Sequence, residues 1–177
     1  MSRELELTEP RPTPLGAAGR GLAAGIVGTA VMTAYQEAKS RLSSDSGESE
    51  DGGDEGEQTW EDAPEPAKIG KRISEGMFKR KLSSEHIDLT NTIVHWAYGT
   101  GWGMLYGLTQ GTARGRVIPR GLLFGTAVWG SAYVLLPAMK LYKPLWKYPP
   151  STLAADWAQH AVYGLGVAAG YRAIDPA

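Results

Sequence analysis

The sequence predicts an all-α fold, namely a four-helix transmembrane bundle that repeats one helical hairpin in tandem, with a disordered acidic loop after the first helix. Three observations favour this class. Glycine makes up 23 of the 177 residues, and 20 of the 37 Asp, Glu, Lys and Arg residues lie between positions 40 and 90. The rest of the chain contains four long segments almost free of charge, which are 21–36, 89–113, 121–139 and 148–171. Because a helix needs about 20 residues to cross a bilayer, each segment is long enough once its flanks are included.

Composition excludes several other classes of protein. The chain has no cysteine, which removes disulfides, thiolate catalysis and cysteine-ligated metals. A net charge of -1 argues against a nucleic-acid partner, because binding a phosphate backbone needs an excess of Lys and Arg. A soluble helical domain is the main alternative, but the five glycines of 89–113 would each cost about 1 kcal/mol in a helix exposed to water. A β-barrel is the weaker alternative, because four segments cannot supply the minimum of eight strands.

The N-terminal half is predicted to alternate between disorder and helix. Residues 1–18 are rich in Pro and Glu and are expected to form a disordered tail, followed by a first transmembrane helix over 19–38. Residues 39–67 are expected to form a disordered acidic linker. Within it, residues 43–67 hold ten acidic side chains and no basic one, so they cannot bury enough apolar surface to become ordered.

Residues 68–82 change the sign of the charge and are predicted to form a basic amphipathic helix. Ile69, Ile73 and Met77 recur at every fourth position, which places them on one helical face. Basic residues surround this stripe, namely Lys68, Lys71, Arg72, Lys79, Arg80 and Lys81. Three placements are open for this helix: on a lipid headgroup surface, packed over the bundle, or folded back on the acidic linker.

The C-terminal half is predicted to hold three more transmembrane helices, over 84–111, 119–139 and 151–172. Pro137 falls late in the second of these and should kink or terminate it. Residues 140–150 combine lysines, aromatic residues and prolines, which is typical of a loop at the membrane interface.

Comparison of the predicted helices indicates an internal repeat. Six pairs of residues are each 65 positions apart: Asn91 and Asp156, His95 and His160, Tyr98 and Tyr163, Gly99 and Gly164, Gly101 and Gly166, and Tyr106 and Tyr171. The first and third helices agree at an offset of 100, since Arg20-Gly21-Leu22 with Gly25 returns as Arg120-Gly121-Leu122 with Gly125. Two hairpins of the same orientation would be related by an axis along the membrane normal.

Glycine spacing predicts where the helices pack. Four glycines repeat every fourth residue in the 84–111 helix, and three further pairs show the same spacing. These residues are Gly99, Gly103, Gly107 and Gly111, then Gly21 and Gly25, Gly121 and Gly125, and Gly166 and Gly170. Such flat faces let helix backbones approach each other closely in a membrane. The groove could serve the protein's own bundle or a homo-oligomer.

A set of polar residues inside the predicted membrane segments is the candidate functional site. It comprises Asn91, His95, Tyr98, Asp156, His160 and Tyr163. Asp156 and His160 are four residues apart and share a helical face, and ionisable groups at this depth are expensive enough to suggest a function. Three interpretations are open: hydrogen bonds that hold helices together, handling of protons or cations, or a metal site. The sequence assigns no catalytic residue, no cofactor and no metal ligand.

The C-terminal half resembles a known family. The run Gly121-Leu122-Leu123 with Gly125 is followed by Pro137, Met139, Leu141, Pro144, Trp146 and His160. This pattern is similar to the second half of the YagU-like family of uncharacterised bacterial inner-membrane proteins. The resemblance implies a small multi-helix inner-membrane protein with no established reaction or ligand, and no functional residue can be transferred from it.

The sequence therefore favours a non-enzymatic, multi-pass protein of the bacterial inner membrane. Its expected partners are the lipid bilayer and either further copies of itself or another membrane protein, bound through helix packing. The alternative is a small transporter or proton-responsive channel that uses the His/Asp cluster on an unidentified ion or small molecule. The short, acid-free turn with Arg114, Arg116 and Arg120 favours a cytoplasmic location for both termini.

Overall fold

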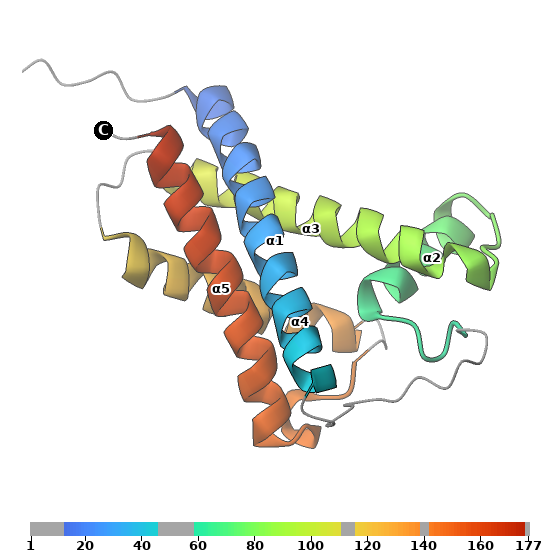
Figure 1. Ribbon diagram of the computed structural model, residues 1–177. Coiled ribbons are helices and arrows are strands. Elements are labelled where there is room, and N and C mark those ends of the chain that lie inside the picture. The colour runs from blue at the N-terminus through green and yellow to red at the C-terminus, as the bar shows by residue number, and fades with distance from the viewer. Residues whose placement is uncertain (1–12, 46–58, 111–115, 139–141, 176–177) are drawn as a thin grey trace, which may run out of the picture.

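The computed structural model describes residues 13–45, 59–110, 116–138 and 142–175, and all its regular elements are helices (Figure 1). The long helices are α1 (Pro14–Asp45), α3 (Ile87–Gln110), α4 (Val117–Ala138) and α5 (Pro150–Ile174). A shorter helix, α2 (Glu65–Met77), precedes α3, and short 3-10 helices occupy Ser84–His86 and Leu145–Lys147. The prediction of an all-α fold is confirmed for the described part of the chain.

The four long helices form two crossing layers. In Figure 1, α1 and α5 lie side by side in front, and α3 and α4 pass behind them. Helix α1 packs against both α3 and α5, α5 also packs against α4, and α2 packs against α3. Paired helices run antiparallel: Gly21 approaches Gly107 while Thr29 approaches Gly99, for example. Helices α1 and α5 are therefore central, and α3 and α4 are peripheral.

Glycines bring the helix backbones of α1 and α3 into direct contact. A Cβ atom added to Gly25 would lie 2.9 Å from Thr100 Cα, and one added to Gly103 would collide with Gly25 Cα. Likewise, Gly107 faces the backbone of Ala17 and Gly21, and Gly99 faces the Thr29 side chain. The groove of Gly99, Gly103 and Gly107 is thus filled by α1, while Gly111 lies outside the described residues.

The other two helix pairs also meet through glycine. Between α4 and α5, a Cβ atom on Gly121 would lie 2.8 Å from Leu165 Cα, and one on Gly125 would collide with the carbonyl oxygen of His160. Between α1 and α5, a Cβ atom on Gly166 would lie 3.0 Å from Gly28 Cα. One on Gly170 would lie 3.0 Å from Val27 Cβ.

Aromatic rings fill the space between the layers. Phe124 of α4 lies 4.8 Å from Tyr106 and 6.3 Å from Trp102, both of α3, measured between ring centroids. Phe124 is also 6.0 Å from Tyr163, and Tyr106 is 5.6 Å from Tyr171, both of α5. Helices α3 and α4 consequently meet through large side chains rather than through their backbones.

Helix α1 is longer than the predicted 19–38. It begins at Pro14, inside the predicted disordered tail of 1–18, and it continues to Asp45. Proline is tolerated in the first helical turn, and the Thr13 hydroxyl accepts a hydrogen bond from the Gly16 amide at 3.2 Å. No glycine or proline interrupts residues 29–45, so the helix runs on into the predicted linker. Residues 1–12 and 46–58, which make up most of the predicted tail and linker, lie outside the described residues.

Helix α2 begins and ends earlier than the predicted 68–82. Pro64 and Pro66 stand at its N-terminal end, where their missing amide hydrogens cost nothing. At the other end the Arg80 amide donates to the Ser74 carbonyl oxygen at 3.1 Å. Lys79 takes a left-handed backbone conformation with φ 54, so the chain reverses there and the helix ends.

The left-handed conformation of Lys79 leads to a stability prediction. Side chains other than glycine are disfavoured at this backbone position because Cβ crowds the next carbonyl oxygen. We expect Lys79→Gly to raise the free energy of unfolding by about 0.5–1 kcal/mol, measured by thermal unfolding in detergent. The same change at Lys81, which is outside the turn, should not stabilise the protein and serves as the control.

The remaining bounds differ only slightly from the predicted 84–111, 119–139 and 151–172. Pro137 lies in the last turn of α4, which ends one residue later. Helix α5 starts with Pro150 in its first turn, and no serine or threonine side chain caps its N-terminal end. The loop predicted over 140–150 contains the 3-10 helix Leu145–Lys147, and residues 111–115 and 139–141 lie outside the described residues.

Two helices are long and apolar enough to cross a membrane, by length and composition. They are α1, over Pro14–Ser43, and α4, over Val117–Ala138. Only 33% of the apolar window of α1 and 17% of that of α4 is buried within the protein, so most of both windows faces the surroundings. Helices α3 and α5 are less apolar because they contain more His, Asp and Tyr residues, so hydropathy supports two spans rather than four.

Candidate functional site

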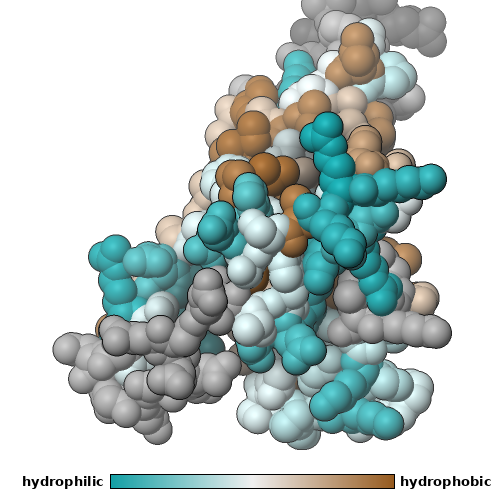
Figure 2. Space-filling view, turned by 90° about the vertical axis from the view of Figure 1, so that its right-hand side faces the viewer, coloured by the Kyte–Doolittle hydropathy of each residue, from teal (hydrophilic) through white to brown (hydrophobic). Residues whose placement is uncertain are grey.

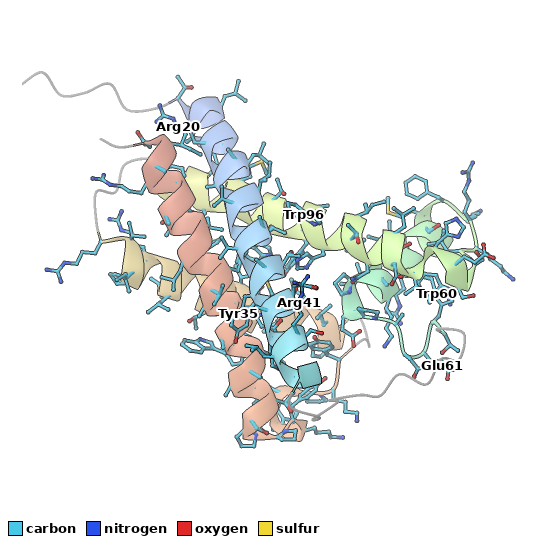
Figure 3. All side chains as sticks on the ribbon, in the orientation of Figure 1. Arg20, Tyr35, Arg41, Trp60, Glu61 and Trp96 are labelled. Carbon is cyan, nitrogen blue, oxygen red and sulfur yellow. The ribbon has the colours of Figure 1, made fainter. Side chains whose placement is uncertain are left out.

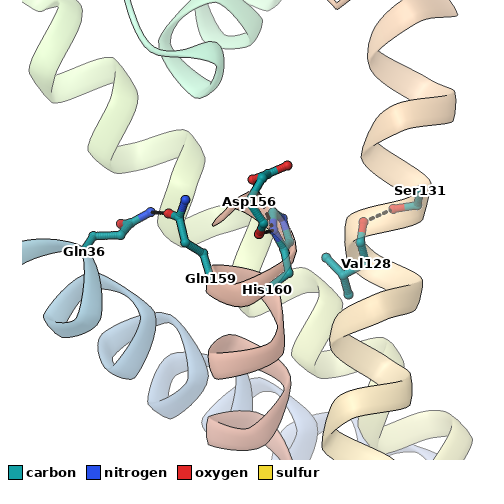
Figure 4. A network of polar contacts seen from close by, with 6 residues as sticks. All are labelled: Gln36, Val128, Ser131, Asp156, Gln159 and His160. Carbon is teal, nitrogen blue, oxygen red and sulfur yellow. Dashed lines mark hydrogen bonds and ion pairs between the residues drawn. The ribbon is translucent and has the colours of Figure 1, made fainter. Parts of the chain in front are cut away.

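Two candidate polar residues of α5, Asp156 and His160, lie in its first half, near the end of the bundle where α1 finishes. The Nδ1 atom of His160 lies 2.8 Å from the backbone carbonyl oxygen of Asp156 and 3.5 Å from its carboxylate (Figure 4). Both side chains are partly buried. The predicted proximity of Asp156 and His160 on one helical face is therefore present, and it orients the imidazole ring.

Helix α3 brings a second histidine to the same region. His95 lies close enough to His160 for their charges to interact. Within the described part of the chain, the Nε2 atom of His95 and the Oδ1 atom of Asn91 are buried without a hydrogen-bond partner. Buried polar atoms without partners are rare in folded proteins, so this region has unused hydrogen-bonding capacity.

Two tyrosines lie near Asp156 and were not part of the predicted site. Tyr133 of α4 and Tyr142 of the following loop are close enough to the Asp156 carboxylate to interact with it. The rings of Tyr133, Tyr142 and Tyr148 lie 5.4–5.9 Å apart, centroid to centroid. We call these three residues the tyrosine cluster. Trp129 packs on Tyr133 at 5.3 Å, and its Nε1 atom is buried without a partner among the described residues.

Electrostatics links the tyrosine cluster to the start of α2. Burial raises the pKa of Tyr142, and the nearby carboxylates of Asp156 and Glu65 raise it further. The phenol is therefore uncharged at neutral pH and can donate a hydrogen bond. Burial also raises the pKa of Glu65, and Lys68, at 3.8 Å, only partly offsets that effect. Acidic groups thus accumulate at this end of the bundle.

The two remaining predicted residues, Tyr163 and Tyr98, have different environments. Tyr163 is buried, and its hydroxyl donates to the backbone carbonyl oxygen of Gly99 at 2.6 Å, which joins α5 to α3. Tyr98 is 42% exposed and packs edge-on against Trp102 at 6.1 Å. Tyr163 thus holds two helices together, whereas Tyr98 lies at the surface.

The Tyr163 hydrogen bond provides a second stability prediction. Tyr163→Phe keeps the ring but removes the hydroxyl that donates to Gly99 O across the two helices, so we expect the free energy of unfolding to fall by about 1 kcal/mol. Thermal unfolding in detergent measures the change. Tyr98→Phe alters an exposed hydroxyl of the same chemistry and should leave stability unchanged. Equal losses in both variants would contradict the role assigned to Tyr163.

Two further hydrogen bonds between helices were not predicted from the sequence. Gln36 of α1 donates to Gln159 of α5 at 2.6 Å (Figure 4). Trp157 of α5 donates to Thr126 of α4 at 3.0 Å. The isolated amides of Gln36 and Gln159 within otherwise apolar segments were the signal that could have identified the first pair. At the other end of the bundle, Arg20 pairs with Asp175 at 3.1 Å, which places the start of α1 beside the end of α5 (Figure 3).

The hypothesis of a metal site finds no geometric support in the described residues. No three His, Asp or Glu side chains among them come together in an arrangement that could hold a metal ion.

Comparison with known proteins found no matching family model, no matching curated protein and no matching solved structure. The resemblance to the YagU-like family stays a prediction that rests on the residues quoted for it.

Proposed function

We propose that the chain is an integral, multi-pass protein of the bacterial inner membrane and that α1, α3, α4 and α5 all cross the bilayer. One observation carries this proposal: the small residues point inward and the large aliphatic residues point outward. Glycines form the contacts between the helices, while Leu22, Ile26, Leu89, Ile93, Leu105, Leu108, Ile118, Leu123, Val134 and Leu135 are exposed.

A water-soluble helical bundle would have the opposite arrangement, with large aliphatic side chains inside. Its helices would associate by burying large aliphatic side chains, which contribute about 1.5–3 kcal/mol each. Here the largest side chains that are fully buried are Ile87, Val167 and Thr29. In lipid, exposed leucine and isoleucine cost nothing, and close backbone contact is what holds helices together. In Figure 2 the apolar residues gather over the upper part of the visible face and hydrophilic residues over the lower part.

Contacts between helices support membrane crossing by α3 and α5, in spite of their lower hydropathy. Each runs antiparallel to a helix that is apolar enough to span, and each is in backbone contact with it. Three polar side chains of α5, Gln159, Trp157 and Tyr163, have hydrogen-bond partners on neighbouring helices. A polar side chain that is hydrogen-bonded within the bundle does not need water.

The spatial pairing of equivalent residues supports an internal duplication. His95 is an electrostatic neighbour of His160, and the Tyr106 ring contacts the Tyr171 ring, each pair being 65 positions apart. The two hairpins differ at one pair of equivalent positions, which are 100 residues apart: α1 has Ala24 where α4 has Phe124. Alanine lets α1 approach α5, whereas phenylalanine separates α4 from α3.

Single-cysteine scanning tests the topology, because the chain has no native cysteine. We expect Leu123→Cys and Ile93→Cys, both at exposed apolar positions of the long helices, to resist a membrane-impermeant maleimide in intact membranes. Thr59→Cys and Glu85→Cys should react from one side only, and a cysteine at Asp175 from the opposite side. Rapid labelling at Leu123 or Ile93 would overturn the proposal, and a reporter fused to the C-terminus tests the expected cytoplasmic location of the termini.

For the biochemical role we propose a non-enzymatic bundle that acts through packing in the membrane. Because α1, α3, α4 and α5 fill one another's glycine faces, a partner or a second copy would bind the outer apolar surface. Chemical cross-linking through Leu123→Cys or Val134→Cys in native membranes tests this. Specific disulfide-linked or maleimide-linked products are expected, and purely monomeric protein would contradict it.

Proton or cation handling is the second candidate, favoured by buried polar atoms of Asn91, His95 and Trp129 that have no hydrogen-bond partner among the described residues. In vesicles with a pH gradient, a flux that Asp156→Asn abolishes and Asp156→Glu retains would support it. Tyr98→Phe serves as a surface control. No flux across a range of cations and pH values would exclude this role while leaving the bundle intact.

A further inference from the structure

Helix α2 uses only part of its apolar surface to dock on α3. Its small residues Ala67 and Gly70 are buried there, and a Cβ atom on Gly70 would collide with the Thr90 methyl group. Ala67 also packs in a small core with Ala63, Ile87 and Trp60. The docking face is therefore made of small residues, which hold α2 close to the N-terminal part of α3.

The larger apolar side chains at the C-terminal end of α2 remain uncovered. Ile73 is 42% exposed, Met77 75% and Phe78 67%. Ile73 and Met77 are four residues apart and so share one face, and Phe78 follows at the end of the helix. This face, Ile73, Met77 and Phe78, is termed the apolar edge of α2.

Basic residues lie directly beside the apolar edge. Lys79, Arg80 and Lys81 follow Phe78 and are all exposed. Within the helix, Lys68 and Arg72 are about 140° and 100° around the axis from Ile73 by the usual helical spacing. The acidic residues nearby in sequence are Glu61, Asp62, Glu65, Glu75, Glu85 and Asp88, of which Glu65 pairs with Lys68. Residues 65–82 hold six basic and two acidic residues, so this stretch carries a clear positive excess.

The position of α2 is fixed by contacts outside the helix. Trp60 donates through Nε1 to the Leu82 carbonyl oxygen at 3.2 Å, and the Lys71 ammonium lies 5.1 Å from the centre of the Trp60 ring (Figure 3). These contacts tie the segments before and after α2 to each other, beside the N-terminal end of α3. Since α3 begins at the end of the bundle where α1 finishes and α5 starts, α2 lies where the proposed bilayer ends.

We propose that α2 and the basic residues that follow it form a binding site for anionic phospholipid headgroups. The apolar edge enters the boundary between headgroups and acyl chains, and Lys79, Arg80 and Lys81 bind the phosphates. Exposed apolar residues beside clustered lysine and arginine are the chemistry that anionic lipid surfaces select. This inference rests on the proposed membrane topology.

A fluorescent probe at the apolar edge tests the site. Phe78→Cys, labelled with bimane, is placed in nanodiscs of phosphatidylcholine alone or with phosphatidylglycerol. We expect a blue-shifted emission in the anionic nanodiscs only, reversed by high salt because surface charge is screened. The triple variant Lys79→Gln, Arg80→Gln, Lys81→Gln should lose the dependence on lipid composition. The pair Lys143→Gln and Lys147→Gln, which removes charge from the other loop at the same end, should retain it.

A second probe separates failure of this site from failure of the topology. Bimane on Leu123→Cys of α4 should report an apolar environment in both kinds of nanodisc. If it does, and the Phe78 probe stays in water in anionic lipid, only the lipid site is overturned. If the Leu123 probe is in water, the proposed topology fails. A blue shift of the Phe78 probe that is sensitive to salt but equal in both kinds of nanodisc would overturn lipid binding. It would indicate that the basic residues bind the acidic segment of the chain instead.

Discussion

Replacing Gly103 by alanine is expected to disrupt the packing of α1 on α3. The added Cβ would collide with Gly25 Cα and approach Gly21 O to 2.6 Å. Both are backbone atoms, so no side chain can rotate away and the helices must separate. We expect a loss of about 2–3 kcal/mol in the free energy of unfolding, seen as a lower midpoint of thermal unfolding in detergent.

Gly101 provides the matched control for this experiment. It lies two residues away in the same helix, and a Cβ there would meet nothing within 4 Å. Gly101→Ala should be neutral or should stabilise the helix by up to about 1 kcal/mol, since alanine has the higher helix propensity. Equal effects at the two positions would show that the backbone contact between α1 and α3 is absent.

Replacing Phe124 by alanine is expected to open the space between α3 and α4. Its ring contacts Tyr106, Trp102 and Tyr163, which come from two different helices. Because α3 and α4 meet mainly through these rings, the cavity has no backbone contact to close it. We expect a loss of about 3–4 kcal/mol, measured by thermal unfolding together with loss of near-ultraviolet circular dichroism.

The neighbouring residue Leu123 serves as the control for Phe124. It is 73% exposed, so Leu123→Ala removes a similar apolar volume without creating an internal cavity. Its stability in detergent should change little. A Phe124→Ala protein as stable as Leu123→Ala would contradict the aromatic core as the link between α3 and α4.

Local patterns predicted much of the helical structure. Charge-free segments predicted the four long helices, because the length and composition of a segment can be read without knowing which helix it packs against. Glycine spacing also indicated which faces pack. The choice of partner for each face did not follow from spacing, since any small-residue face fits any other. Three-dimensional packing assigns Gly99, Gly103 and Gly107 to α1.

The candidate site was predictable only where its residues share a helix. The spacing of Asp156 and His160 implied their contact, whereas Tyr133 and Tyr142 reach Asp156 from another helix and a loop. Helix α2 shows the same limit. Its stripe of Ile69, Ile73 and Met77 indicated the apolar side, but the surface that docks on α3 is formed by Ala67 and Gly70 because only small residues allow close approach.

The uneven hydropathy of the long helices bears on how the chain is made. In the proposed topology α1 emerges from the ribosome before its close-packed antiparallel partner α3, and α4 emerges before its partner α5. Each must stay in lipid alone until its partner is synthesised, and these are the two helices apolar enough to do so. The later helices can enter alongside a waiting neighbour that shields their histidine, aspartate and glutamine side chains. Order of synthesis thus sets how polar each segment can be.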